Sequence, residues 1–148
     1  MNKHADIDPH HSQVVHCGEK EWIPFALPGT FFKPLHLDDN AGRSTFLLKV
    51  PAGCPAPMHK HLAAVEAYVI QGKFGYEGEG IVAAGDYIFE PGGCVHEPIA
   101  GDDEDLILFV VAHGGIVGVN EDGSFGGVVD NDVHYECAAA GGDADHLR

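Results

Sequence analysis

The sequence predicts an all-β protein that folds as one small barrel. Its 148 residues are close to the commonest domain size, which allows a packed core but leaves no room for a second domain of any substance. Hydrophobic residues make up 45% of the chain, and 20 glycines and 9 prolines divide them into short apolar runs. No run has a convincing helical period. Short strands separated by turn residues are typical of a many-stranded barrel.

The expected strands follow these runs in chain order. They cover residues 30–37, 44–50, 58–61, 65–71, 73–76, 86–90, 95–99, 106–112 and 116–119. Asp122 and Gly123 are a hairpin-turn signal, so one more strand is expected through Val128 and Val129.

Both ends of the single domain, which spans residues 1–148, are expected to be flexible tails. Residues 1–15 and 138–148 are polar or small, so they offer little to a core. The N-terminal region carries His4, His10, His11 and His16. A second metal site is one interpretation of these histidines. We favour a solvated arm, because nothing there fixes the geometry of a site.

The chain is strongly acidic, with 8 basic and 23 acidic residues and a net charge of −15. Nucleic acid and anionic membrane are therefore not expected as partners, because both attract clustered Lys and Arg. The acidic blocks 77–79 and 102–105 are interpreted as solvated loops. No apolar stretch approaches the length of a membrane span and no signal segment follows Met1, so a cytoplasmic location is expected.

The cysteines fit that compartment. Cys17, Cys54, Cys94 and Cys137 form no CxxC pair, so neither a zinc ribbon nor a redox dithiol is indicated. Cys54 and Cys94 lie inside the two histidine motifs described next, which makes a ligand role one alternative. Reduced, packed thiols are the interpretation we favour.

Two histidine motifs are the most informative part of the sequence. Residues 53–61 read Gly-Cys-Pro-Ala-Pro-Met-His-Lys-His, which places His59 and His61 two residues apart. Residues two apart on a strand point to the same face, so both imidazoles can share one ion. Residues 85–96 read Gly-Asp-Tyr-Ile-Phe-Glu-Pro-Gly-Gly-Cys-Val-His, where a Pro-Gly-Gly turn leads to His96. A single histidine is usually a surface or core residue, but three in this joint arrangement predict a metal site.

Together these segments resemble the two motifs of the cupin superfamily, whose members are jelly-roll barrels (double-stranded β-helices) with a divalent metal inside. The first motif is met up to His61 and the second from Gly85 to His96, while the family's final asparagine is replaced by Ala100. The resemblance implies a single cupin barrel with His59, His61 and His96 as metal ligands.

Glu66 is the residue for which the family pattern leaves two alternatives. Cupins commonly add a glutamate ligand four or five residues beyond the second histidine, and Glu66 lies five beyond His61. The family usually leaves six residues between that glutamate and the next turn glycine, whereas Glu66 leaves five before Gly72. Counting back from Gly72 puts Val65 at the ligand position and turns Glu66 to the opposite face. We favour a site of three histidines alone, although a β-bulge would bring Glu66 into the site.

A three-histidine site narrows the resemblance to the acetylacetone-cleaving and dihydroxyacetophenone dioxygenases. The likeness covers residues 22–25, 32–36, 59–61, 68–74, 87–96 and 119–123. In that branch a glutamate six residues before the third histidine lies just outside the metal ligands, and Glu90 occupies this position. Such a group orients ligands by hydrogen bonds. A carboxylate in a turn at the barrel rim is the alternative for Glu90.

Three neutral imidazoles leave the charge of a divalent ion uncompensated and leave coordination positions open. Such a site attracts a monoanion with two oxygens, such as the enolate of a β-diketone or an aryl hydroxyketone. The resemblance implies Fe(II), which would orient the substrate toward O2 and act as a Lewis acid. Zinc, nickel and copper would bind the same histidines at least as tightly. Val65, Tyr68, Phe89 and Phe109 are candidates to face the barrel and limit substrate size, with ordinary core packing as the alternative.

The sequence therefore predicts a dioxygenase that cleaves a carbon–carbon bond of a small ketone substrate. One alternative is a metal-binding regulatory protein, similar to the cupin half of zinc anti-sigma factors, although the chain has no room for their additional partner-binding domain. Another is a non-redox cupin isomerase or lyase. A homodimer or homotetramer is expected, because the apolar segment 22–25 can lie across a neighbouring subunit. The other possibility is that this segment covers its own barrel.

Overall fold

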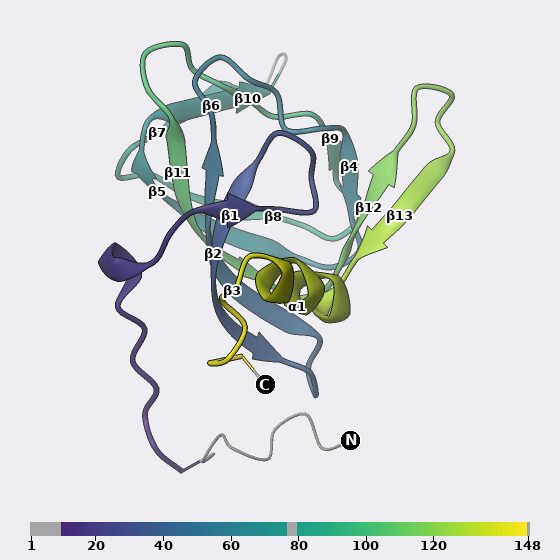
Figure 1. Ribbon diagram of the computed structural model, residues 1–148. Helices are drawn as coiled ribbons and strands as arrows, with labels where there is room; N and C mark the ends of the chain where they lie inside the picture. Colours follow the sequence, from purple (N-terminus) through teal and green to yellow (C-terminus); the bar gives the residue numbers. More distant parts are fainter. Residues whose placement is uncertain (1–9, 77–79, 148) are drawn as a thin grey trace.

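The computed structural model describes residues 10–76 and 80–147, and these form a β-barrel with one α-helix packed against it (Figure 1). The strands are β1 (Ile23–Pro24), β2 (Phe31–Asp38), β3 (Arg43–Val50), β4 (His59–His61), β5 (Val65–Gln71), β6 (Lys73–Tyr76), β7 (Gly80–Ala83), β8 (Tyr87–Glu90), β9 (Val95–His96), β10 (Ile99–Ala100), β11 (Leu106–Ala112), β12 (Ile116–Val119) and β13 (Phe125–Val129). A 3₁₀ turn, η1 (Cys17–Glu19), precedes them, and helix α1 (Asn131–Ala140) follows. In the part of the chain that is described, no helix is long and apolar enough to cross a membrane.

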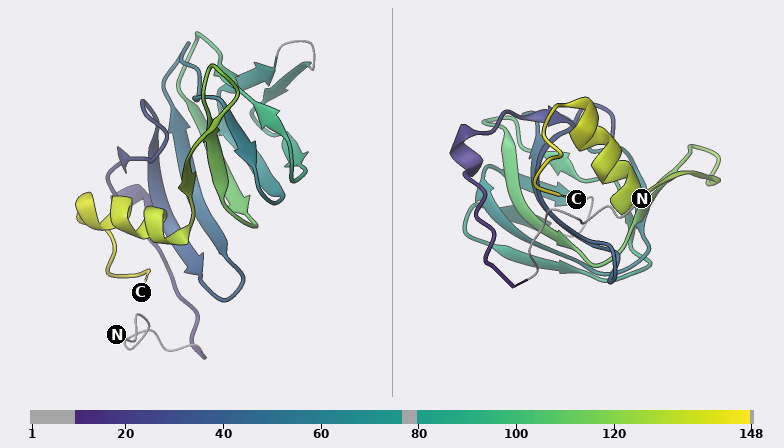
Figure 2. Two further views of the ribbon diagram at one scale, coloured as in Figure 1. Left: turned by 90° about the vertical axis from the view of Figure 1, so that its right-hand side faces the viewer. Right: turned by 60° about the horizontal axis from the view of Figure 1, so that its bottom comes forward.

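The strands form antiparallel sheets that curve around one interior (Figure 2). The largest sheet has the order β1-β2-β3-β11-β5-β8. A second sheet, β13-β12-β4-β9, carries both histidine motifs, and a third has the order β10-β6-β7. Helix α1 packs against β1, β2 and β13. The all-β barrel predicted from the sequence is confirmed.

Strand alternation decides which side chains enter the core. In β5, Val65, Ala67 and Val69 are buried, while Tyr68 and Ile70 are exposed. In β11 the same alternation buries the even-numbered residues from 106 to 112. Each fully buried aliphatic side chain contributes about 1.5–3 kcal/mol to stability, so this pattern holds the register of the sheet.

Three of the residues expected to limit substrate size point out of the barrel, so that prediction was wrong for them. Tyr68, Phe89 and Phe109 are exposed on the outer face of the largest sheet, and only Val65 faces the interior. The reason is register: Phe109 pairs with Tyr68 across β11 and β5, and Phe89 pairs with Glu66 across β8 and β5. Residues paired in this way share a face.

Residues 138–147 are ordered, which corrects the prediction of a flexible tail over residues 138–148, of which Arg148 lies outside the described residues. Residues 131–140 form helix α1, whose N-cap Asp130 accepts a hydrogen bond from the Val133 backbone N–H at 3.1 Å. Ala138 is fully buried and Leu147 is 2% exposed, so the tail contributes to the core. Asp143 forms an ion pair with Lys20 that fixes the segment after the helix.

The described part of the predicted N-terminal tail agrees with the sequence-based expectation. Residues 10–15 lie in no helix or strand and are mostly exposed. Segment 22–25 covers its own barrel: β1 pairs with β2, and Ile23 and Phe25 are buried. These contacts favour the alternative that the segment covers its own barrel, while Trp22 stays half-buried and Pro24 exposed.

The remaining differences are short elements. Strands β1 and β7 were not predicted, and the expected strand 95–99 is divided into β9 and β10 around Pro98, which has no N–H to donate to a ladder. The turn at Asp122 and Gly123 is confirmed, because Gly123 has φ 82° between β12 and β13.

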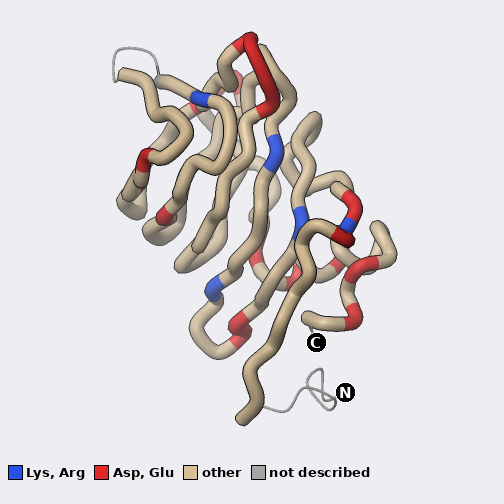
Figure 3. The backbone as a smooth tube through the Cα atoms, turned by 90° about the vertical axis from the view of Figure 1, so that its left-hand side faces the viewer, with Lys and Arg blue, Asp and Glu red and all other residues tan. Residues whose placement is uncertain are grey.

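Acidic residues lie mostly in loops and turns (Figure 3). The block 102–105 forms one such loop, in which Asp105 also accepts a hydrogen bond from the Ala52 backbone N–H at 3.0 Å. The predicted acidic loop 77–79 lies outside the described residues.

Candidate metal centre

The three histidines lie on two neighbouring strands, β4 and β9. His59 pairs directly with His96 across the ladder, and His61 follows two residues later on the same face as His59. The Pro-Gly-Gly turn sets this arrangement: Gly93 has φ 90° and donates its N–H to the His61 carbonyl at 2.7 Å. The His61 N–H donates in turn to the Cys94 carbonyl at 2.9 Å. The second motif is thus hydrogen-bonded to the first.

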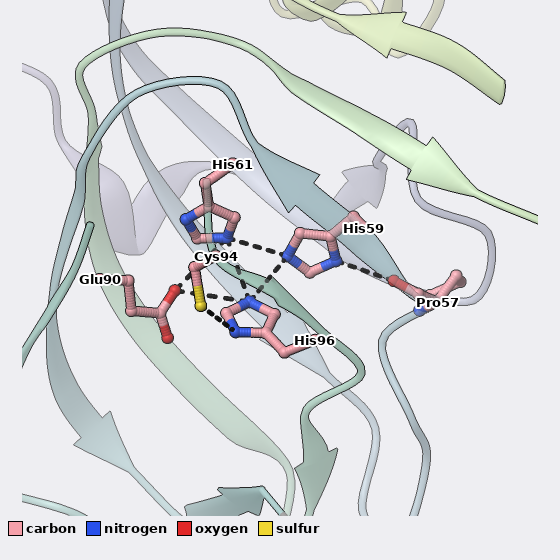
Figure 4. Close-up of polar contacts among 6 residues, drawn as sticks. All are labelled: Pro57, His59, His61, Glu90, Cys94 and His96. Atoms are coloured by element: carbon pink, nitrogen blue, oxygen red, sulfur yellow. Dashed lines mark hydrogen bonds and ion pairs between the residues drawn. The ribbon is translucent and has the colours of Figure 1, made fainter. Parts of the chain in front are cut away.

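The three imidazoles point toward one another (Figure 4). The Nε2 atom of His59 lies 3.0 Å from that of His61 and 3.1 Å from that of His96, and the last pair is also 3.1 Å apart. Among the described residues, this is the group of His, Cys, Asp and Glu side chains close enough to hold a metal ion. His10, His11 and His16 do not belong to it, and His4 lies outside the described residues.

These distances fit one ion. Two nitrogens bonded to a metal at about 2.0–2.1 Å lie about 2.9 Å apart at a right angle and about 3.3 Å apart at the tetrahedral angle. All three measured separations fall between these limits. The His59 Nδ1 donates to the Pro57 carbonyl at 2.8 Å, so its Nε2 carries the lone pair that a metal needs.

The imidazoles are held in the neutral form. Burial, together with the neighbouring imidazoles, lowers the pKa of His61 to about 3. The same causes lower the pKa of His96 to about 4, and burial lowers that of His59. At neutral pH the site therefore offers uncharged nitrogen ligands and does not need to lose protons before it binds a metal.

Cys94 lies beside this group but is not part of it. Its Sγ is 3.3 Å from the Nδ1 of His96, on the outer side of the ring. A contact to the outer nitrogen orients the imidazole and influences which nitrogen carries the proton. The ligand role that the sequence left open for Cys54 and Cys94 has no support, because neither thiol belongs to the group of side chains close enough to hold the ion. None of the four cysteines forms a disulfide within the described part of the chain.

Glu90 faces the same point as the histidines. Its carboxylate Oε2 lies 3.4 Å from the Nε2 of His61 and 3.5 Å from the Nε2 of His96. The side chain is 11% exposed, so Glu90 is not a solvated carboxylate at the rim. The carboxylate lies beside the Nε2 atoms, which face one another, rather than beside the Nδ1 atoms. It would therefore lie next to an ion or a ligand bound by the histidines.

Glu66 lies outside the barrel, as the register counted from Gly72 predicts. The Tyr87 hydroxyl donates to its Oε1 at 2.7 Å, and the His113 Nε2 donates to its Oε2 at 2.6 Å. Both hydrogen bonds lower the pKa of the Glu66 carboxyl. Val65, the neighbouring residue, lines the cavity instead.

We expect Glu66→Gln to leave the metal content nearly unchanged. The Glu66 carboxylate binds Tyr87 and His113 outside the barrel and does not belong to the group that could hold the ion. The measurement is metal per protein chain after dialysis, by elemental analysis, compared with wild type. A clear drop in bound metal, or a changed spectrum of a cobalt-loaded sample, would contradict the assignment.

The histidines and Glu90 open onto a cavity inside the barrel. The volume of this cavity is about 90 Å³, enough for several water molecules or part of a small ligand. Its wall is mostly apolar and includes Phe46, Leu48, Leu108 and Val110. Helix α1 contributes His134 to the same cavity, a residue that the sequence did not single out.

An antiparallel barrel that gathers three histidines of two facing motifs in its interior defines a cupin with a metal site. Residues 10–115 match the family of ChrR cupin-like domains, and the chain belongs to this family. No functionally curated protein matches the sequence.

Solved structures agree on the fold. An RmlC-like cupin from Ralstonia eutropha is 24% identical, with a TM-score of 0.82 over 93% of this chain and 91% of that one. An acetylacetone dioxygenase from Acinetobacter johnsonii is 17% identical, with a TM-score of 0.76 over 90% of this chain and 93% of that one. The anti-sigma factor ChrR of Rhodobacter sphaeroides, in complex with SigE, is 24% identical, with a TM-score of 0.55 over 64% of this chain and 49% of that one.

Proposed function

We propose that the protein is a metal-dependent dioxygenase that cleaves a carbon–carbon bond of a small β-diketone or aryl hydroxyketone. One observation carries the proposal: three neutral imidazoles and one carboxylate lie close together in the wall of a mostly apolar cavity. The similarity in fold to an acetylacetone dioxygenase supports it. His59, His61 and His96 would hold the ion, with Fe(II) as the proposed metal.

A bound divalent metal would supply Lewis acidity and a template for substrate and O2. The three histidines add no negative charge, so the site favours a ligand that brings its own. Glu90 would accept the proton that a diketone or phenol loses on binding, or would hold a hydrogen bond to that ligand, and its 3.4 Å distance to the His61 Nε2 supports this role. The mostly apolar wall favours an organic ligand with apolar surface.

A second candidate is a metal-binding regulatory protein. The family match favours it, because the family is described by the cupin-like domain of ChrR. The structural match joins 64% of this chain to 49% of the ChrR chain. In a regulatory protein the metal site changes the conformation of a partner-binding surface, and turnover of a ketone is not required.

Oxygen uptake separates these candidates. The protein is loaded with Fe(II) under anaerobic conditions and mixed with oxygenated buffer containing acetylacetone or ortho-hydroxyacetophenone. A dioxygenase consumes about one O2 per substrate cleaved and yields two carbonyl fragments. Bound iron with no substrate-dependent uptake would reject the enzyme and favour the regulatory protein. Substrate conversion without O2 consumption would indicate a non-redox isomerase or lyase.

Self-association is proposed on a different surface from the one expected. The outer patch, defined as Tyr68, Ile70, Tyr87, Phe89 and Phe109, lies on β5, β8 and β11. These side chains are exposed by 38 to 59%, and the register places Tyr68 between Tyr87 and Phe109. Contiguous exposed aromatic residues are typical of interfaces. A cytoplasmic location remains a prediction.

We expect light scattering at micromolar concentration to give a mass at least twice the 15.7 kDa of one chain. Phe109→Lys introduces a charge into the outer patch and should shift the protein toward the monomer. Phe125→Lys is the matched control, because Phe125 is exposed on the distant hairpin β12–β13. A wild-type mass near 15.7 kDa would refute the assembly.

A further inference from the structure

Gly118 is a strand glycine that the backbone does not require. It lies inside β12, between Val117 and Val119. A glycine inside a strand is destabilising, because it loses more conformational freedom on folding than other residues and has no side chain to pack. The register of β12 against β13 shifts at this residue, but Gly118 does not have the positive φ that makes glycine necessary in some β-bulges. Other residues could therefore adopt this backbone conformation.

No close contact requires the glycine either. Outside its two chain neighbours, no described heavy atom lies within 4 Å of the point where a Cβ of Gly118 would stand. Gly115, just before β12, shows the contrast, because its Cβ would stand 3.0 Å from the Val129 carbonyl oxygen. Gly118 is half-buried, so its surface is still accessible. The missing side chain leaves an accessible gap in the strand surface.

This gap adjoins the metal centre. Gly118 is paired with His59 across β12 and β4, and His59 is paired with His96 across β4 and β9. Residues paired in this way point to the same face, with Cβ atoms about 4.5–5.5 Å apart. His59 therefore has an imidazole on one side and open space on the other. His61, in contrast, is paired with Ile116, whose side chain lines the cavity.

We propose that Gly118 is a specificity-determining residue, whose missing side chain leaves room for the part of a metal-bound ligand that does not contact the ion. The inference rests on the proposed function in one respect, the binding of a small organic anion at the metal centre. It adds where the bulk of that anion lies, over β12 and beside His59 (Figure 1). A side chain added at position 118 should limit the size of the ligand and leave the three histidines in place.

The test compares two probes of different bulk. Acetohydroxamate and benzohydroxamate offer a metal the same anionic pair of oxygens, and they differ in carrying a methyl or a phenyl group. Both are titrated calorimetrically into zinc-loaded protein, which binds ligands without turnover. We expect wild type to bind both probes. Gly118→Val should weaken benzohydroxamate about 10- to 100-fold, the effect of forcing extra volume into an occupied space, and should leave acetohydroxamate nearly unchanged.

Two further variants make the result specific. Gly118→Ala adds one methyl group and should weaken benzohydroxamate less than Gly118→Val does. Gly18→Val is the matched control, because Gly18 is an exposed glycine on η1 with no described atom near its Cβ position, and it should leave both affinities unchanged. Unchanged binding of benzohydroxamate by Gly118→Val, or an equal loss of both probes, would overturn the inference. Failure of wild type to bind benzohydroxamate would overturn it as well.

Metal content and thermal unfolding give readouts that need no ligand. Elemental analysis should find the wild-type zinc content in both Gly118 variants, because glycine supplies no side-chain ligand. Metal-free Gly118→Val should melt about 2–4 °C higher than wild type, since valine favours strands and would meet no atom here. A lower melting temperature, or zinc lost from both variants, would show that the fold or the site itself needs the glycine and would overturn the inference. Failure of the proposed function is recognised separately, because hydroxamate binding to the zinc protein requires neither O2 nor turnover.

Discussion

Replacing His59, His61 or His96 singly with alanine is expected to remove nearly all bound metal while the barrel stays folded. Each histidine supplies one of three nitrogens that lie within 3.1 Å of one another, and two nitrogens alone hold a divalent ion far more weakly. The fold should persist because the barrel core is formed by other strands and by α1. Metal per chain after dialysis and the far-ultraviolet circular dichroism spectrum measure the two effects.

A second readout and a control sharpen this experiment. A metal that binds only the folded state stabilises it, so added zinc should raise the melting temperature of wild type and not that of the three variants. His113→Ala is the matched control, since His113 is an exposed histidine paired with Glu66 outside the barrel. One metal ion per chain retained in the His96→Ala protein would refute the site.

The faces taken by His59, His61 and Glu66 could be predicted because they follow from strand period, combined for Glu66 with the family's spacing to the turn glycine. His59 and His61 are two residues apart, and the count back from Gly72 fixes which face Glu66 takes. The same rule shows why Tyr68 was misplaced. Val65 and Tyr68 are three residues apart on one strand, so they cannot both face the cavity.

Helix α1 was missed because its buried face carries no large apolar side chain. Asn131, His134 and Ala138 face the core at helical spacing, but two of them are polar and the third is small. A search for apolar periodicity does not detect such a helix. The buried role of His134 depends on Phe25, Phe32 and Phe46, which come from distant parts of the sequence.

The orientation of the Glu90 side chain also could not be predicted from the sequence. Strand pairing places Glu90 opposite Val65, which faces the interior, and this much follows once the β5–β8 register is known. Whether the carboxylate contacts the inner or the outer nitrogens of the imidazoles depends on side-chain rotamers and on the Cys94 thiol beside His96. The resemblance to dioxygenases identified the residue, and the structure shows which side of the rings it contacts.

Glu90→Gln is expected to lower the rate of substrate-dependent oxygen uptake by about 10- to 100-fold, with little loss of bound metal. The substitution keeps the size of the side chain but removes its negative charge and its ability to accept a proton 3.4 Å from the His61 Nε2. Glu66→Gln, on the paired strand but outside the barrel, controls for the loss of one carboxylate. Oxygen uptake by the Fe(II)-loaded variants at saturating ketone gives the rates, and elemental analysis gives the metal content. Wild-type values of both in Glu90→Gln would mean that this carboxylate only lines the cavity.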